Sequence, residues 1–403
     1  MRIIFSIGRY WPAVGGAELL TRELAWRLAS SHEVEVVTLV NNNDPDFLGR
    51  LRRPPHEGFY LDGPVSVHLL RAAGVRRALL EAYIQLACRS RFPRTQQTLF
   101  AAVYRPRLEA LIAAADLVHS LPAMSISLLT LTAEIVSDRS LPFVITPHLH
   151  EEEEALRIQD LLLRADGVIA LTSVERDWIA SAGVSAGKIE VTGIGPVLPV
   201  IPEGGGFRAR YGLNGPLVLF IGRKEAYKGY RQILQAAPAV WQKEPQTAFV
   251  FIGPRTAESC QDFLPWKGEP RILELPAVDE QEKAEALADC DLLCVPSTRE
   301  SFGQVFLEAW SAGKPVIAAD IPVERAIIKE GEDGLLVSQE ASAIAEAILR
   351  LVINPQSARQ MGEKGRLKVW HHYNWERVSS HTVAFYERLV QKRSLSTCPS
   401  VAF

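Results

Sequence analysis

The sequence has few cysteines, no long hydrophobic run and no excess of one charge. Five cysteines occur in 403 residues, without the paired spacing of a zinc site or a disulfide framework. Cys290 and Cys294 flank the start of an apolar run, so we expect buried, free thiols there. No apolar stretch approaches the ~20 residues that span a bilayer. Arg9 interrupts the apolar start of the chain and no cleavage site follows, which argues against a signal peptide. The sequence predicts a cytoplasmic protein, soluble or peripheral to the inner face of the membrane.

The charge balance argues against wholesale binding to a polyanion, but it hides a basic region. The chain has 44 Lys and Arg against 47 Asp and Glu, for a net charge of −3. Between Arg50 and Arg107 there are eleven arginines and three acids, a net charge of +8, which leaves −11 for the rest. Aromatic residues are not interleaved with these arginines, so we expect no nucleic-acid partner.

Two interpretations of this basic region stay open. A mostly apolar helix is predicted over Ala78–Cys88, with arginines on both sides. Apolar surface beside arginine suits a peripheral contact with an anionic membrane through residues 71–107, or capture of an anionic or lipid-linked acceptor. Equally, the helix can pack on a sheet with its arginines in water.

The length and the hydrophobic fraction of 47% allow two domains, and one pattern occurs twice. An apolar strand, Arg2–Gly8, leads through Gly15 and Gly16 into an amphipathic helix. In the second half, Pro216–Gly222 leads through Gly229 into another such helix. Each pattern is typical of the first strand–helix unit of its own domain.

Short apolar runs then alternate with helical segments in both halves. We expect strands at residues 33–40, 117–119, 143–146, 167–171, 189–192, 248–252, 272–275, 292–295, 316–318 and 334–337. Continuous hydrophobicity with intervening helices indicates parallel strands buried on both faces. The predicted fold class is therefore α/β, with two doubly wound, Rossmann-like domains.

A stretch rich in proline and glycine separates the two halves. We therefore predict an N-terminal domain over residues 1–195 and a C-terminal domain over residues 207–374. A further helix is predicted over residues 375–393, followed by a loose tail over residues 394–403.

The richest chemistry follows the predicted strand at 292–295. Ligands of open parallel sheets collect beyond the carboxyl ends of strands. Gly303 allows a close backbone approach, and the helix that begins near residue 304 offers free N–H groups to a phosphate. Glu300 and Glu308 can accept hydrogen bonds from the hydroxyls of a sugar. Arg223 and Lys228, five residues apart after the strand at 216–222, can converge on the same anion.

These residues form a pattern, Pro-Ser-x-x-Glu-Ser-Phe-Gly-x-x-x-x-Glu-Ala, which is followed by Ala312–Ala318 and then by Glu324 and Gly331–Val337. Together with Ile221-Gly222-Arg223 and Lys228-Gly229, the pattern resembles the retaining nucleotide-sugar glycosyltransferases of family 4. The resemblance implies a GT-B fold, in which two Rossmann-like domains face across a cleft. It also implies that the 375–393 helix crosses back to the N-terminal domain.

The resemblance assigns roles to single residues. Glu300 would bind hydroxyls of the donor sugar, Glu308 would bind the ribose, and Arg223 and Lys228 would neutralise the diphosphate. His148 and Glu300 are the predicted catalytic residues. The predicted donor-binding residues are Gly15, Gly16, Arg223, Lys228, Glu300, Ser301, Phe302, Gly303 and Glu308.

Two features of the N-terminal half complete the prediction. Gly15-Gly16 resembles the glycine-rich loop of the family, although a tight turn before a helix also explains the pair. His148 follows the predicted strand at 143–146 and matches a family histidine that reaches the donor sugar.

The expected function is transfer of a sugar from a nucleoside-diphosphate sugar to a hydroxyl acceptor, with retention of configuration. We expect no metal and no cofactor, because Asp289 and Asp291 have metal-site spacing but precede a buried strand. A GT-B sugar-nucleotide epimerase and a non-catalytic sugar-nucleotide-binding protein are the alternatives.

Overall fold

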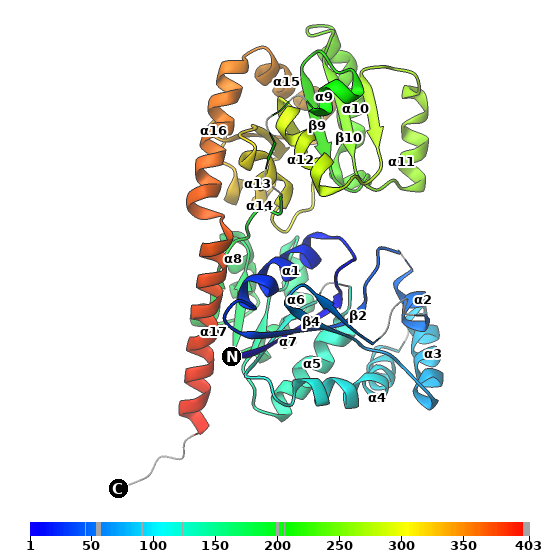
Figure 1. Cartoon of the computed structure of the whole chain (residues 1–403), viewed down its shortest axis with the longest axis vertical. Helices are drawn as coiled ribbons and strands as arrows, with labels where there is room; N and C mark the ends of the chain where they lie inside the picture. The colour runs from blue at the N-terminus through cyan, green and yellow to red at the C-terminus, as the bar shows by residue number, and fades with distance from the viewer. Residues whose placement is uncertain are drawn as a thin grey trace. The chain divides into compact units, whose positions relative to one another are not determined.

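The computed structural model describes residues 1–44, 46–53, 58–89, 92–122, 124–198, 201–202, 204 and 206–397. The chain divides into two compact units. The first unit comprises Met1–Gly193 and Trp375–Phe403, and the second comprises Ile194–Asn374. Each unit has its own mainly parallel sheet with helices around it (Figure 1), which confirms the predicted α/β class.

Within the described residues, the sheet of the first unit has eight strands in the order β3-β4-β2-β1-β5-β6-β7-β8. Their bounds are β1 Arg2–Arg9, β2 Glu33–Val40, β3 Phe59–Asp62, β4 Val65–Leu69, β5 Leu117–Leu121, β6 Phe143–Ile145, β7 Gly167–Ala170 and β8 Ile189–Val191. All pairings are parallel except that of β3 with β4. The central strands are buried on both faces, as their continuous hydrophobicity predicted.

The β3–β4 hairpin was missing from the sequence prediction. In β4, the buried residues Val65, Val67 and Leu69 alternate with half-buried ones. Such alternation is typical of a strand near the edge of a sheet, whereas we had expected only continuous apolar runs. Asp62 at the end of β3 is buried. It accepts a hydrogen bond from Tyr10 Oη at 3.0 Å and forms an ion pair with Arg22. These contacts join the hairpin to the end of the central strand β1 and to α1.

The helices of the first unit are α1 Gly16–Leu28, α2 Phe47–Arg52, α3 Val75–Ala87, α4 Pro93–Ile112, α5 Ile126–Asp138, α6 Glu152–Arg157, α7 Gln159–Arg164, α8 Ser173–Ser181, the 3₁₀ turn η1 Ala186–Lys188, and α17 Trp375–Thr397. The last of these packs on α1, and its Phe385 lies against Gly167 in β7. The predicted helix over 375–393 therefore exists, and its residues belong to the first unit.

Helix α17 extends to Thr397, so the prediction of a loose tail from residue 394 was wrong for residues 394–397. This stretch contains no glycine or proline, and the first proline that follows is Pro399, which disfavours helical backbone at the residue before it. The remaining tail, residues 398–403, lies outside the described residues.

Within its described part, the second unit has a six-stranded parallel sheet in the order β11-β10-β9-β12-β13-β14. The strands are β9 Leu217–Ile221, β10 Ala248–Ile252, β11 Ile272–Leu275, β12 Leu292–Val295, β13 Val316–Ala319 and β14 Gly334–Val337. Most of them begin and end within a residue of the predicted positions. Strands buried on both faces leave an unbroken apolar signal in the sequence, which explains this agreement.

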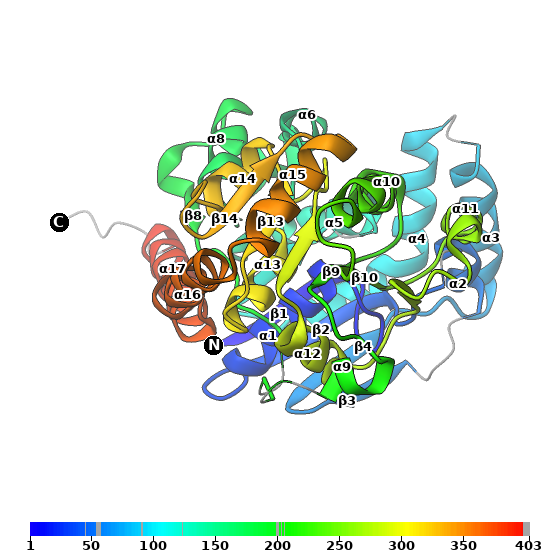
Figure 2. The ribbon, with the colours of Figure 1, turned by 90° about the horizontal axis from the view of Figure 1, so that it is seen from above.

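The helices of the second unit are α9 Gly206–Tyr211, α10 Tyr230–Trp241, α11 Ala257–Asp262, α12 Glu280–Asp289, α13 Gln304–Ser311, α14 Pro322–Ile327, α15 Ala341–Val352, α16 Pro355–His372, and the 3₁₀ turns η2 Ala226–Lys228 and η3 Leu264–Trp266. Helices α10 and α15 lie side by side, as both Figure 1 and Figure 2 show. Helix α13 packs on α16.

Two sequence predictions concern the state of the cysteines and the presence of membrane-spanning helices. Cys290 and Cys294 are buried and free, as expected, and burial raises the pKa of the Cys290 thiol to about 12. Cys88 and Cys260 are exposed free thiols, and Cys398 lies outside the described residues. Across the described ranges, we find no helix with both the length and the apolar character that crossing a membrane requires.

Candidate functional site

The candidate site of the second unit lies where its sheet reverses its winding. After β9 the chain adds β10 and β11 on one side, and it then returns to add β12, β13 and β14 on the other. Ligands of doubly wound sheets bind at the carboxyl ends of the two strands that flank such a switch point. Arg223 and Lys228 follow β9, and Glu300 to Gly303 follow β12. The topology thus places both predicted groups of residues at one edge.

Lys228 and Glu300 form an ion pair at this edge, with Nζ and Oε1 separated by 2.6 Å. Their side chains are only 18% and 12% exposed, so the pair is largely shielded from water. Burial opposes the charge of Lys228, but the Glu300 carboxylate prevails and raises the pKa of the ammonium. Lys228 is therefore a fixed positive charge beside a carboxylate.

Glu324 in the first turn of α14 joins this pair. Its side chain is fully buried, and neither carboxylate oxygen has a hydrogen-bond partner among the described residues. Burial and the negative charge of Glu300 raise the pKa of Glu324 well above its ordinary value, against the effect of Lys228. The surroundings of Glu324 thus favour its protonated form, which is able to donate a hydrogen bond. A buried acid of this kind, without a partner among the described residues, is a candidate for contact with a ligand.

The backbone at Gly303 requires glycine. Gly303 has φ +80° at the start of α13, and a Cβ there would lie 2.5 Å from the Phe306 ring and 3.2 Å from Glu324 Oε1. The neighbouring Phe302 is buried, with its ring edge-on to Tyr373. Only its backbone can face a ligand, whereas Ser301 is half-buried between Glu300 and this anchor. The first turn of α13 carries no acid, which suits an anion.

Glu308 points into the protein rather than into solvent. It is buried, and its Oε1 lies 3.1 Å from Lys283 Nζ in α12. Lys283 also pairs with Glu280 at 2.7 Å. Burial raises the pKa of Glu308 to about 7, with the Lys283 ammonium acting in the opposite direction. Its charge therefore changes near neutral pH.

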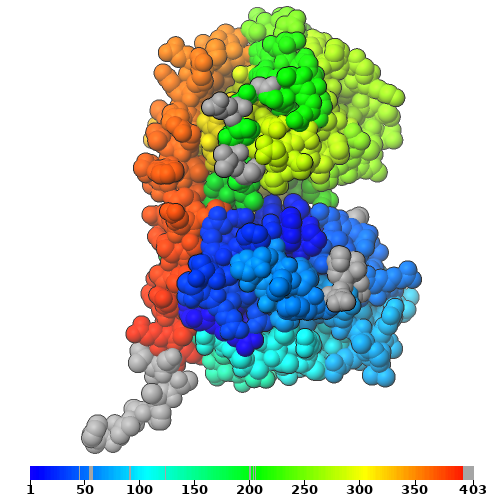
Figure 3. All heavy atoms as spheres, viewed as in Figure 1, coloured from blue at the N-terminus to red at the C-terminus, as the bar shows by residue number. Residues whose placement is uncertain are grey.

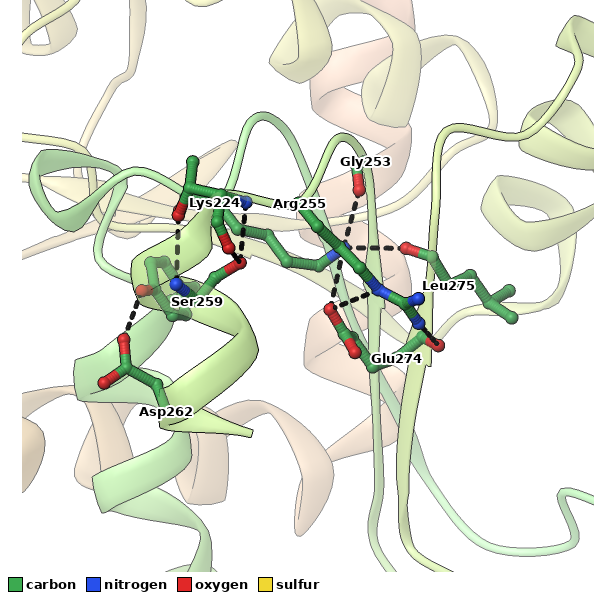
Figure 4. Close-up of polar contacts among 9 residues, drawn as sticks. Lys224, Gly253, Arg255, Ser259, Asp262, Glu274 and Leu275 are labelled. Carbon is green, nitrogen blue, oxygen red and sulfur yellow. Dashed lines mark hydrogen bonds and ion pairs between the residues drawn. The ribbon is translucent and has the colours of Figure 1, made fainter. Parts of the chain in front are cut away.

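Arg223 and its neighbour Lys224 occupy different environments. Arg223 is 54% exposed and pairs with Glu225 on its own loop at 2.8 Å. Lys224 is fully buried, and its Nζ donates to the carbonyl oxygens of Gly253 at 2.6 Å and Leu275 at 2.7 Å (Figure 4). Burial lowers the pKa of Lys224 to about 8. Lys224 thus ties the ends of β9, β10 and β11 together and fixes the loop that carries Arg223.

Gln339 fixes the other end of this loop. Its Nε2 donates to the carbonyl oxygens of Tyr227 at 2.9 Å and Pro296 at 2.6 Å, which joins the segment after β9 to the segment after β12. Gly229, with φ +80°, leaves room for this contact, because a Cβ would lie 2.7 Å from Pro296 O. Gln339 and Lys224 had no recognisable sequence signal, since both lie among polar loop residues.

The first unit has a switch point of its own between β1 and β5, and Gly15 and Gly16 follow β1. A Cβ at Gly15 would lie 2.3 Å from Glu18 Oε2, in the space of an ion pair that joins Arg9 and Glu18 at 2.5 Å. At Gly16 a Cβ would meet no atom within 4 Å. A side chain at position 15 would thus compete with this ion pair, whereas Gly16 presents an open backbone at the start of α1.

His148 follows β6 at the same carboxyl edge. It has φ +57°, a left-handed conformation that is uncommon outside glycine. Burial lowers the pKa of His148 to about 3, so the ring is neutral, and its Nε2 has no partner among the described residues. His150 is exposed, with Nδ1 3.3 Å from Glu154. The structure thus leaves His148, and not His150, with a free buried ring nitrogen.

Glu175 holds the His148 loop, and sequence reasoning missed it. Its buried carboxylate accepts hydrogen bonds from the backbone N–H of Leu149 at 2.8 Å and of Leu171 at 2.6 Å. Burial raises the pKa of Glu175 to about 7. A glutamate early in α8 is indistinguishable in sequence from an exposed residue that favours the helix dipole.

His119 is a structural residue. Its Nδ1 lies 2.5 Å from Tyr386 Oη in α17, and its Nε2 lies 2.7 Å from Thr146 Oγ1. Both ring nitrogens are occupied, and burial lowers the pKa of the ring to about 3. This network links α17 to the strand end that precedes His148.

The acids that we considered for a metal site have other partners. Asp291 Oδ2 accepts from Arg208 at 2.7 Å and from the N–H of Leu217 at 2.7 Å. Asp289 Oδ2 accepts from the N–H of Arg208 at 2.8 Å. No three His, Cys, Asp or Glu side chains of the described residues are placed to hold a metal ion together.

Two Rossmann-like units, each with polar residues at the carboxyl edge of a switch point, are the arrangement found in the GT-B class of sugar-transfer proteins. The family described as Glycosyltransferase Family 4 matches residues 14–195, and that described as Glycosyl transferases group 1 matches residues 208–368. The chain belongs to the glycosyltransferase family that these two descriptions define. The resemblance of its motifs to the glycosyltransferases of family 4 is confirmed.

Named relatives and solved structures agree with this membership. The chain is 32% identical over 184 residues to the phosphatidyl-myo-inositol mannosyltransferase of Mycobacterium tuberculosis, covering 44% of this chain and 48% of that protein. The match thus spans about half the length of this curated relative. HepE of Anabaena, solved with UDP and glucose, has a TM-score of 0.73 at 20% identity and covers 96% of this chain and 100% of HepE. Sucrose-phosphate synthase from Thermosynechococcus elongatus has a TM-score of 0.73 at 21% identity, covering 97% and 100%. These two likenesses show the fold.

Proposed function

We propose that the protein transfers a sugar from a nucleoside-diphosphate sugar to a hydroxyl acceptor, with retention of configuration and without a metal ion or cofactor. One observation carries the proposal. At the switch point of the second unit, a shielded Lys228–Glu300 pair lies with the orphaned acid Glu324. A fixed cation together with donors and acceptors for hydroxyls suits a diphosphate attached to a sugar.

On the donor side, the leaving diphosphate develops negative charge that must be stabilised. Lys228, Arg223 and the start of α13 at Gly303 supply positive charge and N–H donors for it. Glu300 and Glu324 orient the hydroxyls of the donor sugar, one as acceptor and the other as donor of hydrogen bonds. Glu308 accepts hydrogen bonds from the ribose. The nucleotide sugar is a co-substrate, and the protein's own cations replace a metal.

The first unit supplies the remaining groups. The neutral ring of His148, with its free Nε2, can hydrogen-bond to the transferred sugar, and the open backbone at Gly16 can approach it. No carboxylate is assigned as a nucleophile. We therefore propose that the acceptor hydroxyl attacks on the face from which the diphosphate departs, which retains the anomeric configuration.

The proposal is tested first by donor binding. A thermal-shift screen with UDP-, GDP- and ADP-sugars should raise the unfolding temperature for one donor class, because a ligand that binds the native state stabilises it. The relative named a mannosyltransferase makes mannose donors the first choice. Transfer to acceptors that include phosphatidylinositol is then followed with labelled sugar, and the anomeric configuration of the product is read by NMR.

Lys228→Ala or Glu300→Ala should abolish transfer while the fold survives. Glu332→Gln is a matched control, since Glu332 pairs with Lys329 at the surface. Full activity in both site variants would contradict the site. An epimerised donor formed without acceptor would favour the epimerase alternative, and donor binding without turnover would favour a binding protein.

A further inference from the structure

The basic region of the first unit contains arginines that the donor site does not use. Among its described members, Arg52 pairs with Glu81 at 2.7 Å, and Arg105 contacts Glu109 and Asp138. Arg71, Arg76 and Arg107 are exposed, and no described carboxylate pairs with them. Arg91 of the predicted basic region lies outside the described residues. Arg71, Arg76 and Arg107 are thus three of the seven described arginines of this region that form no ion pair with a described carboxylate, the others being Arg53, Arg77, Arg89 and Arg94.

These three arginines line one open pocket. The pocket has a volume of about 410 Å³ and is bounded by Arg71, Arg76, Arg107, Gly58, Phe59 and Leu69. Its arginines come from three elements: the segment after β4, the first turn of α3, and α4. Figure 3 shows this blue-coloured part of the chain at the surface of the first unit. Like charges brought together without a carboxylate raise the electrostatic energy of the free protein, and a bound anion lowers it.

The pocket lies at the carboxyl edge of the sheet but apart from the candidate site. Leu69 is in register with Thr38 in β2, which in turn is in register with Ile7 in β1. Two strand spacings separate β4 from β1, roughly 10 Å, and four separate it from β6, roughly 19 Å. An acceptor molecule of moderate size therefore reaches from this pocket to Gly16 or His148.

The lining specifies the chemistry of the ligand. Guanidinium groups present forked N–H donors that match the oxygens of phosphate, and three of them suit a group with several charged oxygens better than a single carboxylate. The first turn of α3 contains no acid, so its dipole adds to the attraction. Phe59 is 49% exposed and Val75 is 87% exposed, which provides apolar surface beside the charges.

We propose that this pocket binds a phosphate group carried by the acceptor. That the ligand is the acceptor rests on the proposed function. Phosphate binding at Arg71, Arg76 and Arg107 is independent of that function. The phosphate can belong to a lipid headgroup or to a soluble ester. Arginine at this place thus has a recognition role, in contrast to Arg105, which forms ion pairs within the fold.

The test uses the full chain and two phosphate probes. Equilibrium dialysis measures binding of labelled inorganic phosphate, and co-sedimentation measures binding to phosphatidylcholine vesicles with and without phosphatidic acid. The pocket variant is the triple substitution Arg71→Gln, Arg76→Gln and Arg107→Gln. The control variant is Arg53→Gln, Arg89→Gln and Arg94→Gln, which removes the same charge from exposed arginines outside the pocket.

We expect the pocket variant to bind at least tenfold more weakly and the control to bind within twofold of the unaltered protein. If the pocket variant loses binding of inorganic phosphate, the phosphate group belongs to a soluble ester. If it loses only binding to the vesicles, the phosphate group belongs to a lipid. Equal losses in the two variants, or no binding of either probe by the unaltered protein, would overturn the proposal. Donor-induced thermal shifts should be the same in all three proteins, so a failure of the donor site is detected separately.

Discussion

Glu308 is a residue whose charge changes near neutral pH. Its buried carboxyl has a pKa raised to about 7, and the unfolded chain releases this proton near pH 4.5. The native state therefore holds a proton that the unfolded state has lost between these values. The contribution of Glu308 to the free energy of unfolding falls as the pH rises through this window. Ligand binding that needs the ionised carboxylate has the opposite pH dependence.

Binding of a nucleotide sugar should accordingly tighten as the pH rises from 6 to 8. If the ionised Glu308 accepts the ribose hydroxyls, the ionised fraction sets the affinity, and the gain is up to about tenfold. Isothermal titration calorimetry at pH 6, 7 and 8 measures it. Glu308→Gln should bind weakly without this dependence, whereas the surface variant Glu332→Gln should keep it. A flat profile for the unaltered protein would contradict the assignment.

Lys224→Met should destabilise the second unit by about 3 kcal/mol, because the carbonyl oxygens of Gly253 and Leu275 lose a buried charged donor. Donor affinity should fall as well, since the loop with Arg223 and Lys228 loses its anchor. Arg255→Met is the matched control: Glu274 pairs with Lys224 at 3.5 Å and with Arg255 at 2.9 Å, but Arg255 is exposed. Chemical denaturation should show a change below about 0.5 kcal/mol for the control. Equal effects of the two variants would exclude an anchoring role.

Helix α13 is the element that connects fold and site, and it has a left-handed glycine at each end. Gly303 has φ +80° and lies beside Glu324. Gly313 has φ +67°, and a Cβ there would meet no atom within 4 Å. The two glycines share a backbone conformation but differ in their surroundings. Alanine at the two positions therefore separates backbone strain from loss of space.

Gly313→Ala should cost about 1 kcal/mol through backbone strain alone. Gly303→Ala should cost more, because its Cβ must also displace the Phe306 ring, and it should weaken donor binding at least tenfold. Thermal unfolding and donor titration measure both effects. Unchanged donor binding in Gly303→Ala would show that the start of α13 does not contact the ligand.

At the same scale, elements with an unbroken apolar run were predictable and others were not. The strands of the second unit follow from continuous hydrophobicity, whereas the half-buried alternation of Val65–Leu69 was overlooked. Among the site residues, Glu300 and Gly303 carry a spaced pattern. Glu324 continues that pattern, but neither its burial nor that of Glu175 has a local signal, because packing between elements distant in sequence buries both carboxylates.

On the scale of the whole molecule, the first unit is discontinuous in sequence. Trp375, Val378, Phe385 and Tyr386 of α17 are buried in it. Burial of each such side chain contributes about 1.5–3 kcal/mol, so together they account for much of the 5–15 kcal/mol that typically stabilises a domain. The first unit therefore depends on residues that follow the entire second unit.

Truncation after Asn374 should unfold the first unit and abolish transfer, while nucleotide sugar still stabilises the second unit. Circular dichroism and limited proteolysis measure the first effect, and donor-induced thermal shifts measure the second. Truncation after Thr397 should change neither. A truncated chain with a protease-resistant first unit would show that α17 is dispensable.

The hydrogen bond between His119 and Tyr386 also has a consequence for biosynthesis. During translation the ribosome makes all of residues 194–374 before it makes the partner of His119. The unit whose synthesis starts first is thus the last to be completed, which reverses the usual N-terminal-first order of domain folding. Until α17 is made, the nascent chain exposes the surfaces of α1 and β7 that α17 covers, and it is in this interval that a chaperone has a surface to bind.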